Sequence, residues 1–140
     1  MFLLDTNVIS ELRKVGDGRA EEGVAAWVED ADAASFYVSV LTLMELEIGI
    51  LRLERRDVQQ GQMLRTWMDT LVLPEFRERT LPVDPAVALM CARLHVPDPR
   101  AERGALIAAT AIVHSMSVVT GNVADFEKTG VEVIDPWTRH

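Results

Sequence analysis

Three acidic residues stand where they could together hold a metal ion. Asp5 closes the apolar run at the N-terminus, Glu45 lies one turn into the helix expected after the apolar run 35–40, and Asp125 follows the run 117–120 on a short turn. Short apolar runs ended by polar residues are consistent with buried parallel strands. Open parallel sheets bind ligands outside the carboxyl ends of their strands. We therefore expect the three carboxylates to converge at that edge of the sheet.

A cluster of carboxylates at one sheet edge suits a hard divalent cation. Mg²⁺ and Mn²⁺ prefer oxygen ligands, and Mg²⁺ keeps several of its waters. Such ions can activate a water and stabilise the leaving oxygen when a phosphodiester bond is cleaved. Polar residues beside the expected strand ends are candidates to support the acids: Thr6, Asn7, Thr120 and Asn122.

Each acid also has a purely structural explanation. Asp5 is a favoured residue type for capping the helix that follows it. Glu45 stands three residues after Thr42, the spacing of a capping box, in which the Glu side chain binds the backbone at the helix start. Asp125 fits a turn or a helix cap. Glu47 should face away from Glu45, because residues two apart on a helix diverge by about 200°.

The alternation of strands and helices predicts the fold class. Helical patterns separate five apolar runs, which read FLLD, SFYVSV, TLPVD, SVVT and VEVI. Such alternation argues for a parallel sheet with helices on both faces. The sequence contains no internal repeat and no linker. We predict one α/β domain over residues 1–140, a three-layer α/β/α sandwich with a central parallel sheet.

The apolar spacing also predicts where the main helices lie. One helix is expected over 41–56, and a second from about 57 to 73, where Pro74 should end it. A helix capped by Asp84 should run to about residue 95. The small apolar residues of 105–111 predict a helix that lies close against the sheet.

Composition and charge limit the classes of function. The chain of 140 residues is 49% hydrophobic and 26% charged, as is usual for a soluble globular protein. It has no apolar run approaching the ~18 residues of a membrane span and no signal-peptide pattern, so we expect a cytoplasmic protein that does not enter a membrane. The net charge of −8 argues against a broad basic surface for nucleic acid. It does not exclude a nuclease, since a bound metal inverts the local potential of a carboxylate cluster.

The cysteine and the histidines give no functional signal. Cys91 lies among apolar residues of a helical pattern and is expected to be a small buried hydrophobe. His95, His114 and His140 are isolated from one another and lack the spacing of a metal site, so we expect them to be structural.

Four segments resemble the PIN-domain ribonucleases, specifically toxins of the VapC type and their FitB-like relatives. They are LLDTNVISELRK (3–14), SVLTLMELEIGI (39–50), ALIAATAIVHSMSVVT (105–120) and NVADFEKTGVEVIDPW (122–137). The resemblance covers nearly the whole chain in the expected order. It implies an α/β/α sandwich, Mg²⁺-dependent (or Mn²⁺-dependent) endoribonuclease activity on RNA, a homodimer, and inhibition by a cognate antitoxin protein.

The resemblance also assigns the site residue by residue. Asp5, Glu45 and Asp125 match family acids, which implies metal-binding and catalytic roles for them. Positions that support the first acid, or that are often polar or acidic in the family, are matched by Thr6, Asn7 and Asn122.

Gly104 is the main departure from the family pattern. Family members usually carry an Asp directly before ALIAATA, and this metal-ligand position holds Gly104 here. Gly is tolerated at a helix start, so the fold should survive the loss of the ligand. Glu102 could substitute only if that turn is irregular, and Asp98 is a weaker substitute. The family also often has Arg or Asn where Gly121 stands.

Three functions follow from these observations. The first is a toxin-type metal-dependent ribonuclease, impaired in this version by Gly104. The second is a PIN-fold module that mainly binds its antitoxin and no longer cuts RNA, which the same glycine favours. The third, a phosphotransferase of the haloacid dehalogenase type, needs a second Asp where Asn7 stands and is disfavoured.

Two surface features bear on partners. The apolar helix face with Met63, Trp67 and Leu71 is longer than one small core needs and predicts a homodimer. Arginines at 52–56, and Arg100 with Arg103 near the site, could steer RNA phosphates or be solvated helix ends.

Overall fold

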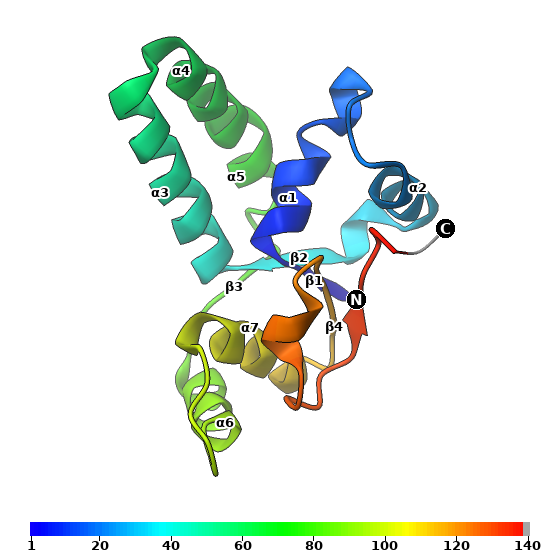
Figure 1. The fold of residues 1–140 in the computed structure, drawn as a ribbon, viewed down its shortest axis with the longest axis vertical. Helices are drawn as coiled ribbons and strands as arrows, with labels where there is room; N and C mark the ends of the chain where they lie inside the picture. Colours follow the sequence, from blue (N-terminus) through cyan, green and yellow to red (C-terminus); the bar gives the residue numbers. More distant parts are fainter. Residues whose placement is uncertain (139–140) are drawn as a thin grey trace.

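A five-stranded parallel sheet lies between two groups of helices in the computed structural model, which describes residues 1–138 (Figure 1). His140 therefore lies outside the described residues. The strands pair in the order β3-β2-β1-β4-β5, and every pairing is parallel. This confirms the predicted α/β fold with a central parallel sheet. The strands are β1 (Phe2–Leu4), β2 (Phe36–Ser39), β3 (Thr80–Leu81), β4 (Ser117–Val119) and β5 (Val133–Ile134).

Helices connect the strands and cover both faces of the sheet (Figure 1). The α-helices are α1 (Thr6–Leu12), α2 (Glu22–Asp30), α3 (Val40–Arg56), α4 (Val58–Trp67), α5 (Leu73–Glu75), α6 (Pro85–Leu94) and α7 (Glu102–Val113). Shorter turns are η1 (Val15–Asp17), η2 (Ala33–Ser35), the π-helical η3 (Met68–Val72) and η4 (Val123–Phe126). No helix within residues 1–138 is long and apolar enough to cross a membrane.

The core has one apolar layer on each face of the sheet, because side chains alternate along a strand. Leu4 of β1 packs with Val8 of α1 and Leu46 of α3 on one face, and Leu3 packs with Ile107 of α7 on the other. Both leucines are fully buried. Outside this second layer, α6 packs on α7 through residues that include Val87, Cys91, Ala105 and Ala109. The sheet edge that carries Asp5 is thus held rigidly from both sides.

The start of α3 differs from the predicted capping box. Ser39, the last residue of β2, caps the helix, and its hydroxyl accepts a hydrogen bond from Leu41 N at 3.0 Å. Thr42 is buried inside the first turn rather than at the cap. The capping-box interpretation of Glu45 is therefore wrong, and its carboxylate is free for other contacts.

Pro74 does not end the helical segment as predicted. The chain continues from α4 through η3 into α5, and Pro74 lies in the first turn of α5. Leu73 N donates to Met68 O across five residues, which is the π-helical pattern. Proline lacks the N–H that would donate to the preceding turn, and the change to the π-helical hydrogen-bond pattern falls directly before it. The π-helical turn thus lies directly before α5, and Pro74 is accommodated within the helical segment.

The two remaining helices fall close to their predicted places. Asp84 caps α6 by accepting from Val87 N at 3.0 Å, and His95 is its C-cap. Helix α7 begins at Glu102, so Gly104 is its third residue and is buried instead of standing at the cap. Gly104 is therefore an interior position of a regular first turn.

Candidate active site

Asp5 is a fully buried carboxylate at the carboxyl end of β1. Its Oδ1 accepts from the backbone N of Thr6 at 2.8 Å, which caps α1. Its Oδ2 accepts from the Thr120 hydroxyl at 2.8 Å and from Asn7 Nδ2 at 3.4 Å. A buried carboxylate is tolerated only when its oxygens are hydrogen-bonded. Asp5 is thus both the helix cap and an oriented acid at the sheet edge.

A network of polar side chains joins the end of β1 to the loop after β4. Asn7 donates to Thr120 Oγ1 at 3.1 Å and accepts from Gly121 N at 3.0 Å. Thr120 Oγ1 also accepts from Asn122 N at 3.0 Å. The parallel pairing of β1 with β4 brings these two strand ends together. Asn7 and Thr120 therefore hold Asp5, whereas Asn122 contributes to the network through its backbone.

Glu45 projects from α3 toward the same edge. Its Oε1 accepts from the Thr6 hydroxyl at 2.8 Å. Glu47 faces elsewhere, as predicted: Arg65 of α4 binds it with two donors, at 2.7 and 2.8 Å, and these hydrogen bonds lower the pKa of Glu47. Only one of these two α3 acids is thus available to the site.

Arg103 of α7 bridges Asp5 and Glu45. Its Nη2 contacts Asp5 Oδ1 and lies 3.3 Å from Thr6 Oγ1, and its Nε lies 2.6 Å from Glu45 Oε2. Burial disfavours the charged guanidinium, but its contacts with the negatively charged carboxylates of Glu45 and Asp5 outweigh burial and raise the pKa of Arg103. The site at the sheet edge therefore consists of two carboxylates that share one internal cation.

The sequence did not predict this position of Arg103. Arg100 and Arg103 were both expected to be able to steer RNA phosphates, but the structure gives them different partners. Arg100 donates at 2.8 Å to two backbone carbonyls, those of Leu94 and Glu127, and does not contact either acid. No sequence signal separates the two arginines, since the reach of each depends on where α7 begins.

Asp125 stands apart from the other two acids. It lies in η4, is exposed, and its side chain makes no ion pair or hydrogen bond within residues 1–138. No group of three metal-binding side chains occurs among these residues. The expected convergence of three carboxylates is therefore not found, although Asp5 and Glu45 do meet.

Gly104, in the first turn of α7, lies beside the backbone of Asp125. A Cβ atom at this position would be 3.1 Å from the backbone O of Asp125 and 3.7 Å from its Cβ. An acidic side chain at 104 would thus start beside Asp125, on the helical turn that also carries Arg103. At the other departure from the family pattern, a Cβ on Gly121 would lie 2.9 Å from the Trp137 ring, so a larger residue there requires the ring to move.

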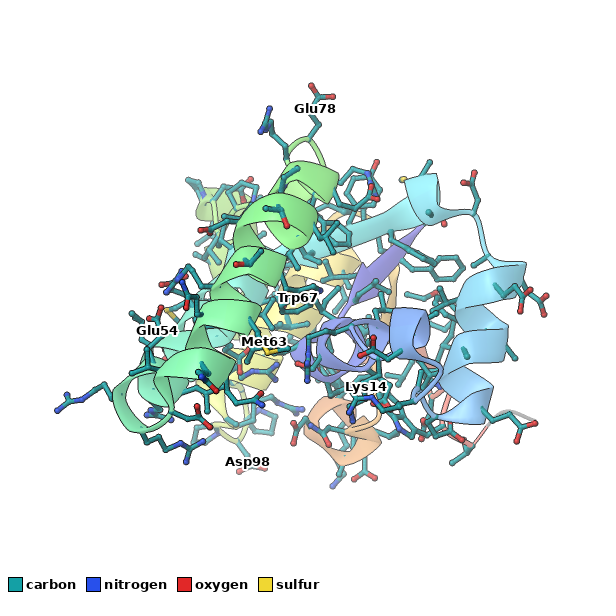
Figure 2. All side chains as sticks on the ribbon, turned by 90° about the horizontal axis from the view of Figure 1, so that it is seen from above. Lys14, Glu54, Met63, Trp67, Glu78 and Asp98 are labelled. Carbon is teal, nitrogen blue, oxygen red and sulfur yellow. The ribbon has the colours of Figure 1, made fainter. Side chains whose placement is uncertain are left out.

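The two candidate substitutes for the missing acid do not reach the site. Glu102 is exposed at the start of a regular helical turn. The pKa of Cys91 on α6 is raised mainly by burial of the thiol and, to a lesser extent, by the negative charge of Glu102. Asp98 is exposed on the loop between α6 and α7 (Figure 2). Neither residue makes an ion pair or hydrogen bond with the residues around Asp5. Their proposed substitution for a ligand gains no support.

A cleft of about 200 Å³ opens beside Glu45 between α1, α3 and α4. Trp67 and Leu64 line it from α4, Ile50 from α3 and Arg13 from α1. Trp67 and Met63 project from α4 on the side of α1 (Figure 2). The acidic site thus continues into a largely apolar groove.

The chain is an α/β/α domain that holds two oriented acids at the carboxyl edge of a parallel sheet. The PIN domain family matches residues 2–132, and the chain belongs to this family. It is 33% identical to VapC ribonuclease Y4jK of Sinorhizobium fredii, over 98% of each chain, and 34% identical to Toxin FitB of Neisseria gonorrhoeae, over 98% of this chain and 99% of that one. The crystal structure of FitAcB from Neisseria gonorrhoeae superposes with a TM-score of 0.88 at 33% identity, over 99% of each chain. The resemblance to the VapC and FitB group is thereby confirmed.

Proposed function

We propose that this chain is the toxin of a toxin–antitoxin pair and a metal-dependent endoribonuclease, as a single PIN domain over residues 1–140. The observation that carries the proposal is the sharing of one cation by Asp5 and Glu45 at the carboxyl edge of the sheet. Relatives that match over almost their whole length carry the names VapC ribonuclease and Toxin FitB, which supports the same activity here.

Asp5 and Glu45 fit a Mg²⁺ or Mn²⁺ ion. Mg²⁺ is commonly held by one or two carboxylates while it keeps several waters, and these two carboxylates already balance one positive charge. Asp125 stays the proposed third ligand, although its exposed side chain does not converge with the other two carboxylates in this structure. When bound, the metal supplies an activated water and stabilises the leaving oxygen of the RNA phosphodiester. Asn7 and Thr120 orient Asp5, and Thr6 holds Glu45.

Gly104 should weaken this activity. It provides no carboxylate beside Asp125, and the residues around it supply no replacement. Fewer charged ligands lower the affinity of a site for a divalent cation. We infer a nuclease whose metal site is incomplete in this version.

A second candidate is a PIN module that mainly binds an antitoxin. The apolar cleft beside Glu45 favours it, because Trp67, Leu64 and Ile50 offer a surface for a protein segment that does not depend on Gly104. Such a module would still bind the antitoxin, as in the first proposal, but would not cleave RNA.

RNA cleavage by Gly104→Asp separates the two functions. We expect this variant to cut a structured RNA in Mg²⁺ faster than the parent chain. Gly104→Ala is the matched control, since it adds the same Cβ without a carboxylate and should not gain activity. Adding Asp5→Asn to Gly104→Asp should abolish the gain. If Gly104→Asp folds but cuts RNA no faster than Gly104→Ala, the nuclease proposal fails and the binding module becomes the better account.

A further inference from the structure

Arg103 supplies the positive charge that a metal ion would supply to Asp5 and Glu45. The two acids come from distant parts of the chain, one at the end of β1 and the other on α3, and the guanidinium contacts both. Asp5 is completely buried, so its charge needs a compensating cation inside the protein. A metal ion that binds both carboxylates and the guanidinium therefore compete for the same place.

We propose that Arg103 competes with the divalent cation for the same site. The Arg103 guanidinium must leave the Asp5–Glu45 pair before a metal ion can bind both carboxylates. The inference rests on the proposed metal site and adds its regulation. The device is local: it requires rotation of one side chain and no rearrangement of the sheet or of α7.

Several features make Arg103 a displaceable counter-ion. Its side chain is 31% exposed, so it has a path to solvent, whereas Asp5 has none. Its Nε is close to Glu45 but has no hydrogen-bond partner of ordinary geometry among residues 1–138. Arg103 also lies in the first turn of α7, where the helix dipole disfavours a positive charge. The ion pair is thus less favourable than its short contacts suggest.

Arg100 shows that the arrangement is particular to position 103. The two arginines flank the same helix start and carry the same charge, but Arg100 is satisfied by backbone carbonyls of Leu94 and Glu127. Removing Arg100 changes the net charge of the protein without removing a partner of Asp5 or Glu45. It is therefore the matched control for long-range electrostatics.

The test compares Mn²⁺ affinity in Arg103→Met, Arg100→Met and the parent chain, measured by electron paramagnetic resonance of free Mn²⁺ during titration with MnCl₂. We expect Arg103→Met to bind Mn²⁺ roughly tenfold more tightly than the parent, which is the scale of one hydrogen bond to a charged group. Arg100→Met should gain much less. Adding Asp5→Asn to Arg103→Met should remove the gain.

A thermal-unfolding readout distinguishes competition from a merely structural ion pair. Without metal, Arg103→Met should unfold at a lower temperature, because Asp5 has lost its counter-ion. Added MnCl₂ should raise the unfolding temperature of Arg103→Met more than that of the parent, since stabilisation grows with affinity. If Arg103 were only structural, the variant would lose stability and bind Mn²⁺ no better.

A second variant, Arg103→Lys, tests the same inference if Arg103→Met does not fold. Arg103→Lys keeps a charge but cannot bridge two carboxylates with a planar fork, so it should also bind Mn²⁺ more tightly than the parent. Unchanged affinity in the folded Arg103 variant overturns the inference. If Gly104→Asp cleaves RNA but the Arg103 variants bind Mn²⁺ no more tightly than the parent, only the competitor role of Arg103 is refuted. If the Arg103 variants bind Mn²⁺ more tightly but Gly104→Asp does not cleave RNA, only the nuclease function is refuted.

Discussion

The Thr120 hydroxyl donates to Asp5 Oδ2 at 2.8 Å and so ties the end of β4 to the acid at the end of β1. Both residues are fully buried. The hydrogen bond links two segments that are more than one hundred residues apart in the sequence. It explains how a short strand can present a buried carboxylate in one fixed orientation.

Removal of the Thr120 hydroxyl should destabilise the protein. Thr120→Val keeps the shape of the side chain but withdraws a donor from a buried carboxylate, which costs about 1–3 kcal/mol in free energy of unfolding. Thr120→Ser keeps the hydroxyl and should cost less. Urea unfolding measures both. Equal stabilities of the Val and Ser variants would show that Asp5 does not depend on this bond.

The stability of the α3–α4 pair should depend on pH through Glu47. Arg65 lowers the pKa of Glu47 in the folded state, so the ion pair stabilises the fold above the unfolded-state pKa, and this contribution is lost as the pH falls through the folded-state pKa. Glu47→Gln should therefore be less stable than the parent near neutral pH. The difference should begin to shrink as the pH falls below the unfolded-state pKa of about 4.5, and it should vanish below the lower folded-state pKa of Glu47.

Glu78→Gln is the control for this pH dependence. Glu78 is exposed at the periphery (Figure 2) and makes no ion pair within the described residues. Its substitution should change the free energy of unfolding little at any pH. Because Glu47 is partly exposed, solvent and salt screen the pair, so its effect should shrink in high salt. A Glu47 effect that persists at acidic pH would contradict the assignment.

The chain should form a homodimer through apolar residues of α4 and its continuation. Met63 and Leu71 are 64% and 61% exposed, and we expect these two apolar side chains to be covered at the dimer interface. Light scattering should give the mass of two chains at micromolar concentration, and Met63→Lys with Leu71→Lys should shift it toward one. Arg55→Glu, at the exposed end of α3, is a charge-changing control. A monomeric parent chain would refute this prediction.

The sequence predicted the frame of the site better than its details. Apolar runs such as the one before Asp5 define parallel strands, and a parallel sheet necessarily gathers their carboxyl ends, so the meeting of Asp5 and Glu45 was predictable. Local signals decide less. Thr42 and Ser39 both suit a helix cap, and only the end of β2 selects Ser39.

The remaining differences depend on geometry that residue types do not encode. Arg103 reaches the acids because α7 begins at Glu102, which sets the direction of a long flexible side chain. Asp125 is exposed in η4, a short turn whose course the residue types do not specify. Pro74 is admitted by a π-helical turn that depends on packing of Met68 and Val72 in the core. Each outcome follows from tertiary context rather than from a local pattern.

The most direct test of the cation site is a crystal of the parent chain soaked in MnCl₂, with an anomalous difference map at the manganese absorption edge. We expect a peak between the carboxylates of Asp5 and Glu45, with the Arg103 guanidinium moved out of the position where it now bridges them. A map with Arg103 in place and manganese bound elsewhere, or nowhere, would contradict the assignment of this sheet edge as the metal site.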